Sequence, residues 1–124
     1  MADARHELGL AAEQAVATWL ETSGWRIVAR RHRTLSGGEV DLIALDPGQV
    51  LVAIEVRARR SKKAGDGSES IDARRTSRIG RSLVDFGSST RVSHRGTRID
   101  LVLVAPADVP GRWNARRIPD IGSG

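Results

Sequence analysis

Two short apolar segments, each with an acidic residue near its centre, constrain this chain more than any other feature. They are residues 38–44 and 53–57, which carry Asp41 and Glu55 among valine, leucine, isoleucine and alanine neighbours. The turn-forming sequence Asp-Pro-Gly at residues 46–48 lies between them, so we expect the segments to pair as a β-hairpin. Each acid then lies in a buried or half-buried strand, where an ionised carboxylate is costly unless a cation or a donor compensates it.

A hairpin of this kind brings the two acids together. Directly opposed residues point to the same face of a hairpin. The register that sets Asp41 opposite Glu55 also pairs two other residues, Leu45 with Leu51. Strand alternation then adds Arg57 to the acids' face. At ~4 Å and an effective dielectric constant of about 20, two like charges repel by about 4 kcal/mol. We therefore expect the pair to hold a metal ion or to share a proton.

Glu13 is the third candidate acid. It lies in a helix expected over residues 3–23, at the margin of an apolar stripe that includes Trp19. Small neighbouring residues would let this helix approach the sheet closely enough for Glu13 to lean over the acids' face. Together with Asp41 and Glu55 it would form a set of hard oxygen ligands suited to Mg²⁺ or Mn²⁺.

The composition points to a polyanionic partner. The chain has 124 residues, a formal net charge of +5 and no cysteine, so disulfides and thiolate chemistry are excluded. Its basic residues are nearly all arginines, whose planar forks suit phosphate oxygens. With three tryptophans, one phenylalanine and no tyrosine, a base-stacking platform is poorly supported. The charged N-terminal segment leads to no long apolar run, so we expect a cytoplasmic protein with no membrane span.

The pattern along the chain predicts one α/β domain over residues 1–124, in the order αβββαββ, with a mixed sheet flanked by helices. A flexible basic loop is expected at about residues 60–69, a shorter basic loop at 31–33, and a helix end at Gly87. The expected elements are a helix at 3–23, strands at 25–30, 39–45 and 50–59, a helix at 71–86, and strands at 98–104 and 113–118.

Several motifs, taken in order, resemble the YraN-like family. They are the spacing of Gly9 and Glu13, the segments 38–43 and 55–57, the helix opening 71–79, and the strand 98–102. That family is grouped with Holliday-junction-resolvase-like nucleases of the PD-(D/E)XK superfamily, and the match extends from about residue 8 to about residue 105. The resemblance implies a restriction-endonuclease-like fold and a metal-dependent nuclease acting on DNA, with branched or recombination-related substrates among the candidates.

The same resemblance assigns roles by position. Glu13, Asp41 and Glu55 match the metal-binding acids, and Arg57 occupies the position of the superfamily's lysine. That lysine is thought to orient or activate the attacking water and to stabilise charge on the phosphate. Arginine can stabilise the phosphate but cannot act as a base. Its fork could instead pair with Glu55 or Asp41 and neutralise the site.

Positive side chains are expected to hold the DNA backbone without reading its sequence. Ordinary structural roles stay open beside this hypothesis: the acids could form strand ion pairs, and Asp100, in an apolar strand, is expected to bind an arginine. A non-catalytic nucleic-acid-binding module, a protein-interaction adaptor in a DNA-processing complex, and a homodimer acting on two strands also stay open. The expected backbone-binding residues are Arg59, Arg60, Lys62, Lys63, Arg75 and Arg78.

Overall fold

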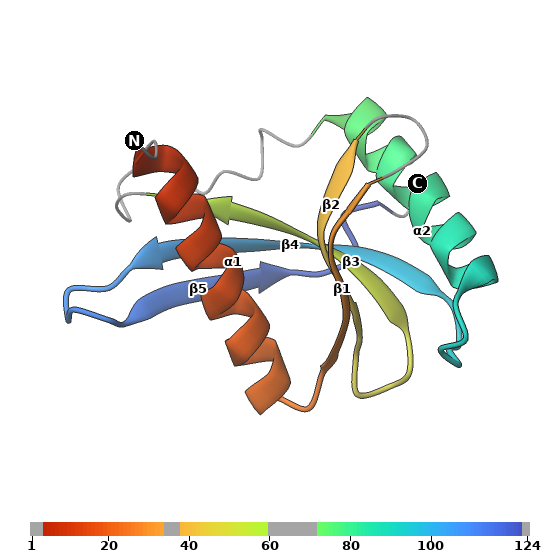
Figure 1. Cartoon of the computed structure of the whole chain (residues 1–124), viewed down its shortest axis with the longest axis horizontal. Helices are drawn as coiled ribbons and strands as arrows, with labels where there is room; N and C mark the ends of the chain where they lie inside the picture. The colour runs from red at the N-terminus through yellow and green to blue at the C-terminus, as the bar shows by residue number, and fades with distance from the viewer. Residues whose placement is uncertain (1–3, 34–37, 60–71, 123–124) are drawn as a thin grey trace.

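The computed structural model describes residues 4–33, 38–59 and 72–122, and it has an α/β fold in the predicted order (Figure 1). The basic loop predicted at about residues 60–69 lies outside the described residues. The elements are α1 (Ala4–Thr22), β1 (Arg26–Arg33), β2 (Glu39–Leu45), β3 (Leu51–Ala58), α2 (Ala73–Ser89), β4 (Thr97–Pro106) and β5 (Trp113–Ile118).

One mixed sheet of five strands, in the order β1-β2-β3-β4-β5, forms the centre of the fold. Strands β3 and β4 are parallel, and every other neighbouring pair is antiparallel. A parallel pair needs a crossover connection, and α2 lies within it. The sheet is strongly twisted, so the β1–β2 pair stands upright in Figure 1 while β4 and β5 run nearly horizontally.

The two helices pack against separate apolar clusters. Helix α1 crosses in front of the strands in Figure 1, whereas α2 lies at the upper right. The cluster around α1 consists of Ala12, Val16, Ala17, Leu20, Leu42, Ala44, Val52, Ile54, Val102 and Val104. The cluster around α2 consists of Val40, Ile43, Leu45, Leu51, Ala53, Ile79, Leu83 and Ile99.

Helix α1 meets the sheet along a narrower stripe than predicted. Ala12, Val16 and Leu20 recur every four residues and are almost fully buried. The prediction that Trp19 belongs to this stripe is wrong, because Trp19 lies to one side of it and is 38% exposed. Within the described residues, neither helix is long and apolar enough to cross a membrane.

Helix α2 extends past its predicted end. Asp72 caps its first turn, because the side chain accepts the Arg74 N–H at 2.8 Å. Gly87 does not end the helix, which continues to Ser89. A Cβ at Gly87 would come within 2.9 Å of the His94 ring. The glycine is therefore needed for close packing here and not for a left-handed helix end.

A buried acidic residue joins β4 to β5 and to the chain that follows. Asp100 is 0% exposed and accepts hydrogen bonds from Arg98 (2.8 and 3.1 Å), from Arg117 (2.8 Å) and from the Asp120 N–H (3.0 Å). Both guanidinium groups also lie over the Trp25 ring, at 5.9 and 5.3 Å from its centroid. The expectation that Asp100 binds an arginine is confirmed.

Candidate active site at the opening between strands β2 and β3

The β2–β3 hairpin has the predicted register. Leu45 pairs with Leu51, and extending this register sets Asp41 opposite Glu55. The Asp-Pro-Gly turn explains the outcome, since the Asp46 carboxylate accepts backbone N–H groups within the turn at 2.8 and 2.9 Å. The sequence therefore predicted correctly which positions of the two strands oppose each other.

The strands separate where the acids begin. The paired positions of β2 and β3 run back only to Leu42 and Ile54. At the next position the Asp41 Oδ2 accepts the Val56 N–H at 2.9 Å, so a side chain replaces a backbone acceptor. The alternation of β2 also changes here: Val40 packs in the α2 cluster and Leu42 in the α1 cluster, although residues two apart in a regular strand share a face. We call this opening, which contains Asp41, Glu55 and Val56, the strand fork.

Glu55 is a buried carboxylate with only one oxygen satisfied. The residue is 2% exposed, and its Oε2 accepts a hydrogen bond from Arg75 Nη2 at 2.7 Å. Its Oε1 is buried and has no hydrogen-bond partner among the residues that the structure describes. An unsatisfied buried acceptor is unfavourable, so this oxygen can take a cation or an external donor.

The electrostatics of the strand fork favour a bound proton or cation. Burial, reinforced by the charges of Glu55 and Glu13, raises the pKa of Asp41 from 3.8 to about 7, although the Val56 N–H and Arg75 act in the opposite direction. Burial also raises the pKa of Glu55, against the lowering effect of Arg75. The two acids therefore do not both carry a full charge readily near neutral pH unless a cation accompanies them.

The third predicted acid has a partner of its own. Glu13 Oε2 accepts hydrogen bonds from Arg31 Nε at 3.2 Å and Arg31 Nη2 at 3.1 Å. Its charge still raises the pKa of both Asp41 and Glu55. Across residues 4–33, 38–59 and 72–122, however, no three acidic or histidine side chains are grouped so that they could hold a metal ion. Glu13 as a third ligand stays a prediction.

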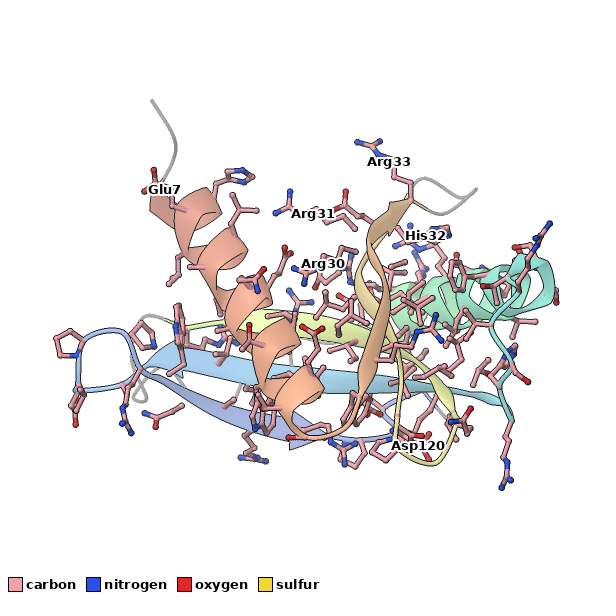
Figure 2. All side chains as sticks on the ribbon, turned by 60° about the horizontal axis from the view of Figure 1, so that its bottom comes forward. Glu7, Arg30, Arg31, His32, Arg33 and Asp120 are labelled. Atoms are coloured by element: carbon pink, nitrogen blue, oxygen red, sulfur yellow. The ribbon has the colours of Figure 1, made fainter. Side chains whose placement is uncertain are left out.

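An unusual backbone conformation explains how Arg31 reaches Glu13. The predicted loop at residues 31–33 is instead part of β1, with Arg31 at φ +49°. Consecutive strand residues normally point to opposite faces. Here Arg30 contacts Gln14 at 2.8 Å while Arg31 contacts Glu13, so both side chains reach α1. Figure 2 shows Arg30 and Arg31 between α1 and β1, whereas Arg33 points outward. No sequence signal identifies a left-handed arginine.

The cation that pairs with Glu55 differs from the predicted one. Arg57 forms no ion pair within the part of the chain that is described, although its charge lowers the pKa of Glu55. The ion pair comes from Arg75 of α2, which the sequence had suggested for the DNA backbone. Arg57, Arg59 and Arg75 share one further property: the Nε of each is buried without a hydrogen-bond partner among the described residues.

The remaining predicted contacts are only partly described. Arg78 is exposed on α2 and lines a shallow pocket together with Arg74 and Arg81. Arg60, Lys62 and Lys63 lie outside the described residues. A separate groove of about 790 Å³ lies between α1 and β5, lined in part by Trp19 and Trp113, and includes none of the three acids.

The raised pKa of Asp41 predicts that the stability of the fold depends on pH. A raised pKa means that the folded protein binds a proton that the unfolded chain has already released, so stability falls as pH rises from about 4 to about 7. The difference between 3.8 and about 7 corresponds to at most ~4 kcal/mol. In urea unfolding across this range, Asp41→Asn should lose that slope, while the contribution of Glu55 is expected in both proteins. Parallel curves for wild type and variant would contradict this view of the strand fork.

These features define a class: an α/β domain whose mixed sheet opens at a buried acidic pair surrounded by arginines. Residues 12–104 match the family model described as "Uncharacterised protein family UPF0102". The chain belongs to this family, which is the YraN-like family that its motifs resemble.

Similar proteins occur in several bacteria. A UPF0102 protein of Symbiobacterium thermophilum is 40% identical over 111 residues, covering 90% of this chain and 92% of the relative. One from Pelotomaculum thermopropionicum is 48% identical over 79 residues, which is 64% of each chain. One from Anaeromyxobacter dehalogenans is 37% identical over 106 residues, covering 86% of this chain and 78% of the relative. None of these three names states an activity.

Proposed function

We propose that this protein is a metal-dependent phosphodiesterase that cleaves nucleic acid, with DNA as the expected substrate. The observation that carries the proposal is the buried Oε1 of Glu55, which has no partner among the described residues and belongs to a carboxylate that repels Asp41. Two acids that repel each other and leave one oxygen free suit a divalent cation better than they suit an ordinary ion pair. The net charge of +5 favours a polyanionic substrate.

The oxygens of Asp41 and Glu55 fit Mg²⁺ or Mn²⁺, which prefer carboxylate ligands. When bound, such an ion lowers the pKa of a coordinated water and polarises a phosphoryl oxygen. The chain's own residues would prepare the site. The Val56 N–H fixes the orientation of Asp41, and Arg31 fixes that of Glu13. Arg57 would stabilise the charge that develops on the phosphate.

One contact favours a second candidate, a non-catalytic nucleic-acid-binding module. Arg75 already places a positive charge 2.7 Å from Glu55, so it partly takes the place of a metal. Calorimetric titration with Mn²⁺ separates the two candidates. Binding at micromolar concentration that is lost in Asp41→Asn supports the enzyme, whereas no binding even with DNA present supports the module.

A nuclease assay tests the enzyme directly. Single-stranded, duplex, flap and four-way DNA substrates are incubated with the protein in Mg²⁺, in Mn²⁺ and in EDTA. We expect cleavage of at least one substrate with metal and none in EDTA. Failure on every substrate, together with no Mn²⁺ binding in the presence of DNA, would contradict the proposed function.

Arg57 should act through its charge. If it stabilises the phosphate, Arg57→Lys keeps most of the activity, and Arg57→Ala loses about 10²-fold or more. Because Arg57 has no ion pair among the described residues, the alanine variant should stay within about 1 kcal/mol of the wild-type stability. Arg112 is an exposed arginine in the β4–β5 connection, so Arg112→Ala is the control and should match the activity and stability of wild type. Equal activity in Arg57→Ala and wild type would remove Arg57 from the mechanism.

A further inference from the structure

We propose that Arg59 and Arg75, together with Arg57, form a binding site for a phosphate group next to the strand fork. The assignment of that phosphate to a nucleic-acid strand rests on the proposed function. The site itself rests on the strand face that Arg57 and Arg59 share with Glu55, on the contact of Arg75 with Glu55, and on the unsatisfied donors of the three arginines.

Strand geometry places two of the arginines on the face of Glu55. Arg57 follows Glu55 by two positions in β3, so both side chains point the same way. Strand β3 ends at Ala58, but the Arg59 N–H still donates to the Val104 carbonyl at 2.8 Å. The extended pairing with β4 thus continues to Arg59. Glu55, Arg57 and Arg59 then follow one another along one face, with ~7 Å between successive side chains.

Helix α2 contributes the third arginine to the same face. Arg75 lies in its first turn, after the cap at Asp72, and its Nη2 binds Glu55 Oε2 at 2.7 Å. The Arg75 side chain is 36% exposed, so its guanidinium lies between the buried acid and the solvent. An anion that approaches Glu55 from the solvent would therefore meet Arg75.

The three arginines have donors that the protein does not use. The Nε–H of each is buried without a hydrogen-bond partner among the described residues, and so is the acceptor Glu55 Oε1. If these donors faced that acceptor they would satisfy it, so they must point elsewhere. An unmet buried donor is unfavourable, and native proteins leave few of them. Because these donors are buried, an external acceptor would satisfy all three only when the side chains turn outward to meet it.

Phosphate is the ligand that fits these donors best. The Nε–H and one Nη–H of an arginine form a parallel pair that binds two oxygens of one phosphate. Three positive side chains beside the two acids, Glu55 and Asp41, leave a local excess of positive charge, which a phosphodiester would balance. A phosphate held here lies next to Asp41 and Glu55, where the proposed reaction would take place.

Arg59 gives the sharpest test because Arg57 and Arg75 also influence the acids. A fluorescent single-stranded oligonucleotide is titrated in EDTA with wild type, Arg59→Lys, Arg59→Gln and the control pair Arg112→Lys and Arg112→Gln. Lysine keeps the charge but loses the fork, so we expect Arg59→Lys to bind ~5-fold or more weakly with an unchanged salt dependence. Arg59→Gln should bind ~10-fold or more weakly, with a salt slope smaller by ~0.7. The control variants should change binding much less.

Inorganic phosphate distinguishes the source of the ligand. Arg59-dependent binding of the oligonucleotide supports a nucleic-acid strand. If only inorganic phosphate binds, and Arg59→Gln abolishes it, the site takes a free oxyanion and the nucleic-acid assignment is overturned. If Arg59→Lys binds like wild type, or the Arg112 variants match the Arg59 variants, the fork-specific site is overturned. The titrations contain no metal, so they test this site apart from cleavage. Arg59-dependent binding, together with no cleavage in the assays with Mg²⁺ and Mn²⁺, would contradict the proposed function and leave this site intact.

Discussion

Replacing Asp100 with alanine is expected to reduce the free energy of unfolding by ~3–5 kcal/mol, the range seen when one partner of a buried ion pair is removed. Asp100 is fully buried and accepts bonds from Arg98, Arg117 and the Asp120 N–H. Without it, two guanidinium groups beside Trp25 lose their main acceptor. Arg98 keeps its contact with Asp46 at 3.0 Å, which places the expected loss below the sum of the separate contacts.

Urea unfolding at neutral pH measures this loss. Asp85→Ala, an exposed acid in α2, is the control and should stay within ~0.5 kcal/mol of wild type. Asp100→Asn keeps a carbonyl oxygen but loses the charge, so it should lie between alanine and wild type. A loss below ~1 kcal/mol in Asp100→Ala would mean that the network contributes little to folding.

The Asp100 network also indicates how far sequence reasoning reaches. A lone acid in an otherwise apolar strand predicts that a cation compensates it, and Arg98, two residues away, was a natural candidate. Arg117 could not be predicted, because its position depends on the β4–β5 register, which pairs it with Val102. Local patterns thus show that a partner is needed, whereas tertiary pairing decides which residue supplies it.

For the fold, too, local patterns were predictable from the sequence, whereas features that depend on tertiary contacts were not. Apolar periodicity and the Asp-Pro-Gly turn were sufficient to predict the order of elements and the β2–β3 register. The predicted end of α2 was wrong because Gly87 was interpreted as a helix end. In the structure Gly87 lies inside the helix and packs closely against His94. The loop predicted at residues 31–33 was wrong because these residues form the end of β1, where His32 and Arg33 pair with β2.

For the candidate site, alternation and turn length predicted the hairpin register correctly for the pairs from Leu45 with Leu51 to Leu42 with Ile54, next to the two acids. Arg75 was missed as the partner of Glu55, since helix spacing does not show which sheet position a helix residue meets. The contact between Arg31 and Glu13 depends on a backbone conformation at Arg31 that arginine adopts rarely. Such outliers become visible only in three dimensions, and they frequently lie at functional sites.

Asp41→Asn is expected to separate activity from stability. The asparagine carbonyl can still accept the Val56 N–H, so the strand fork should keep its shape. The substitution also removes a buried charge whose pKa is raised to about 7, so above that pH the variant should be at least as stable as wild type. Cleavage should nevertheless fall by ~10³-fold or more, since a metal site supplies several kcal/mol of transition-state stabilisation.

Three measurements on the same protein preparations test this expectation. They are cleavage of the preferred substrate with Mg²⁺ or Mn²⁺, urea unfolding at pH 8, and the melting temperature with and without metal. Metal should raise the melting temperature of wild type and not that of Asp41→Asn, because only a ligand that binds the folded state stabilises it. Glu21→Gln, an exposed acid in α1, is the matched control and should behave like wild type in all three. An Asp41→Asn protein that is destabilised, yet cleaves at the wild-type rate, would assign Asp41 to the fold and not to the reaction.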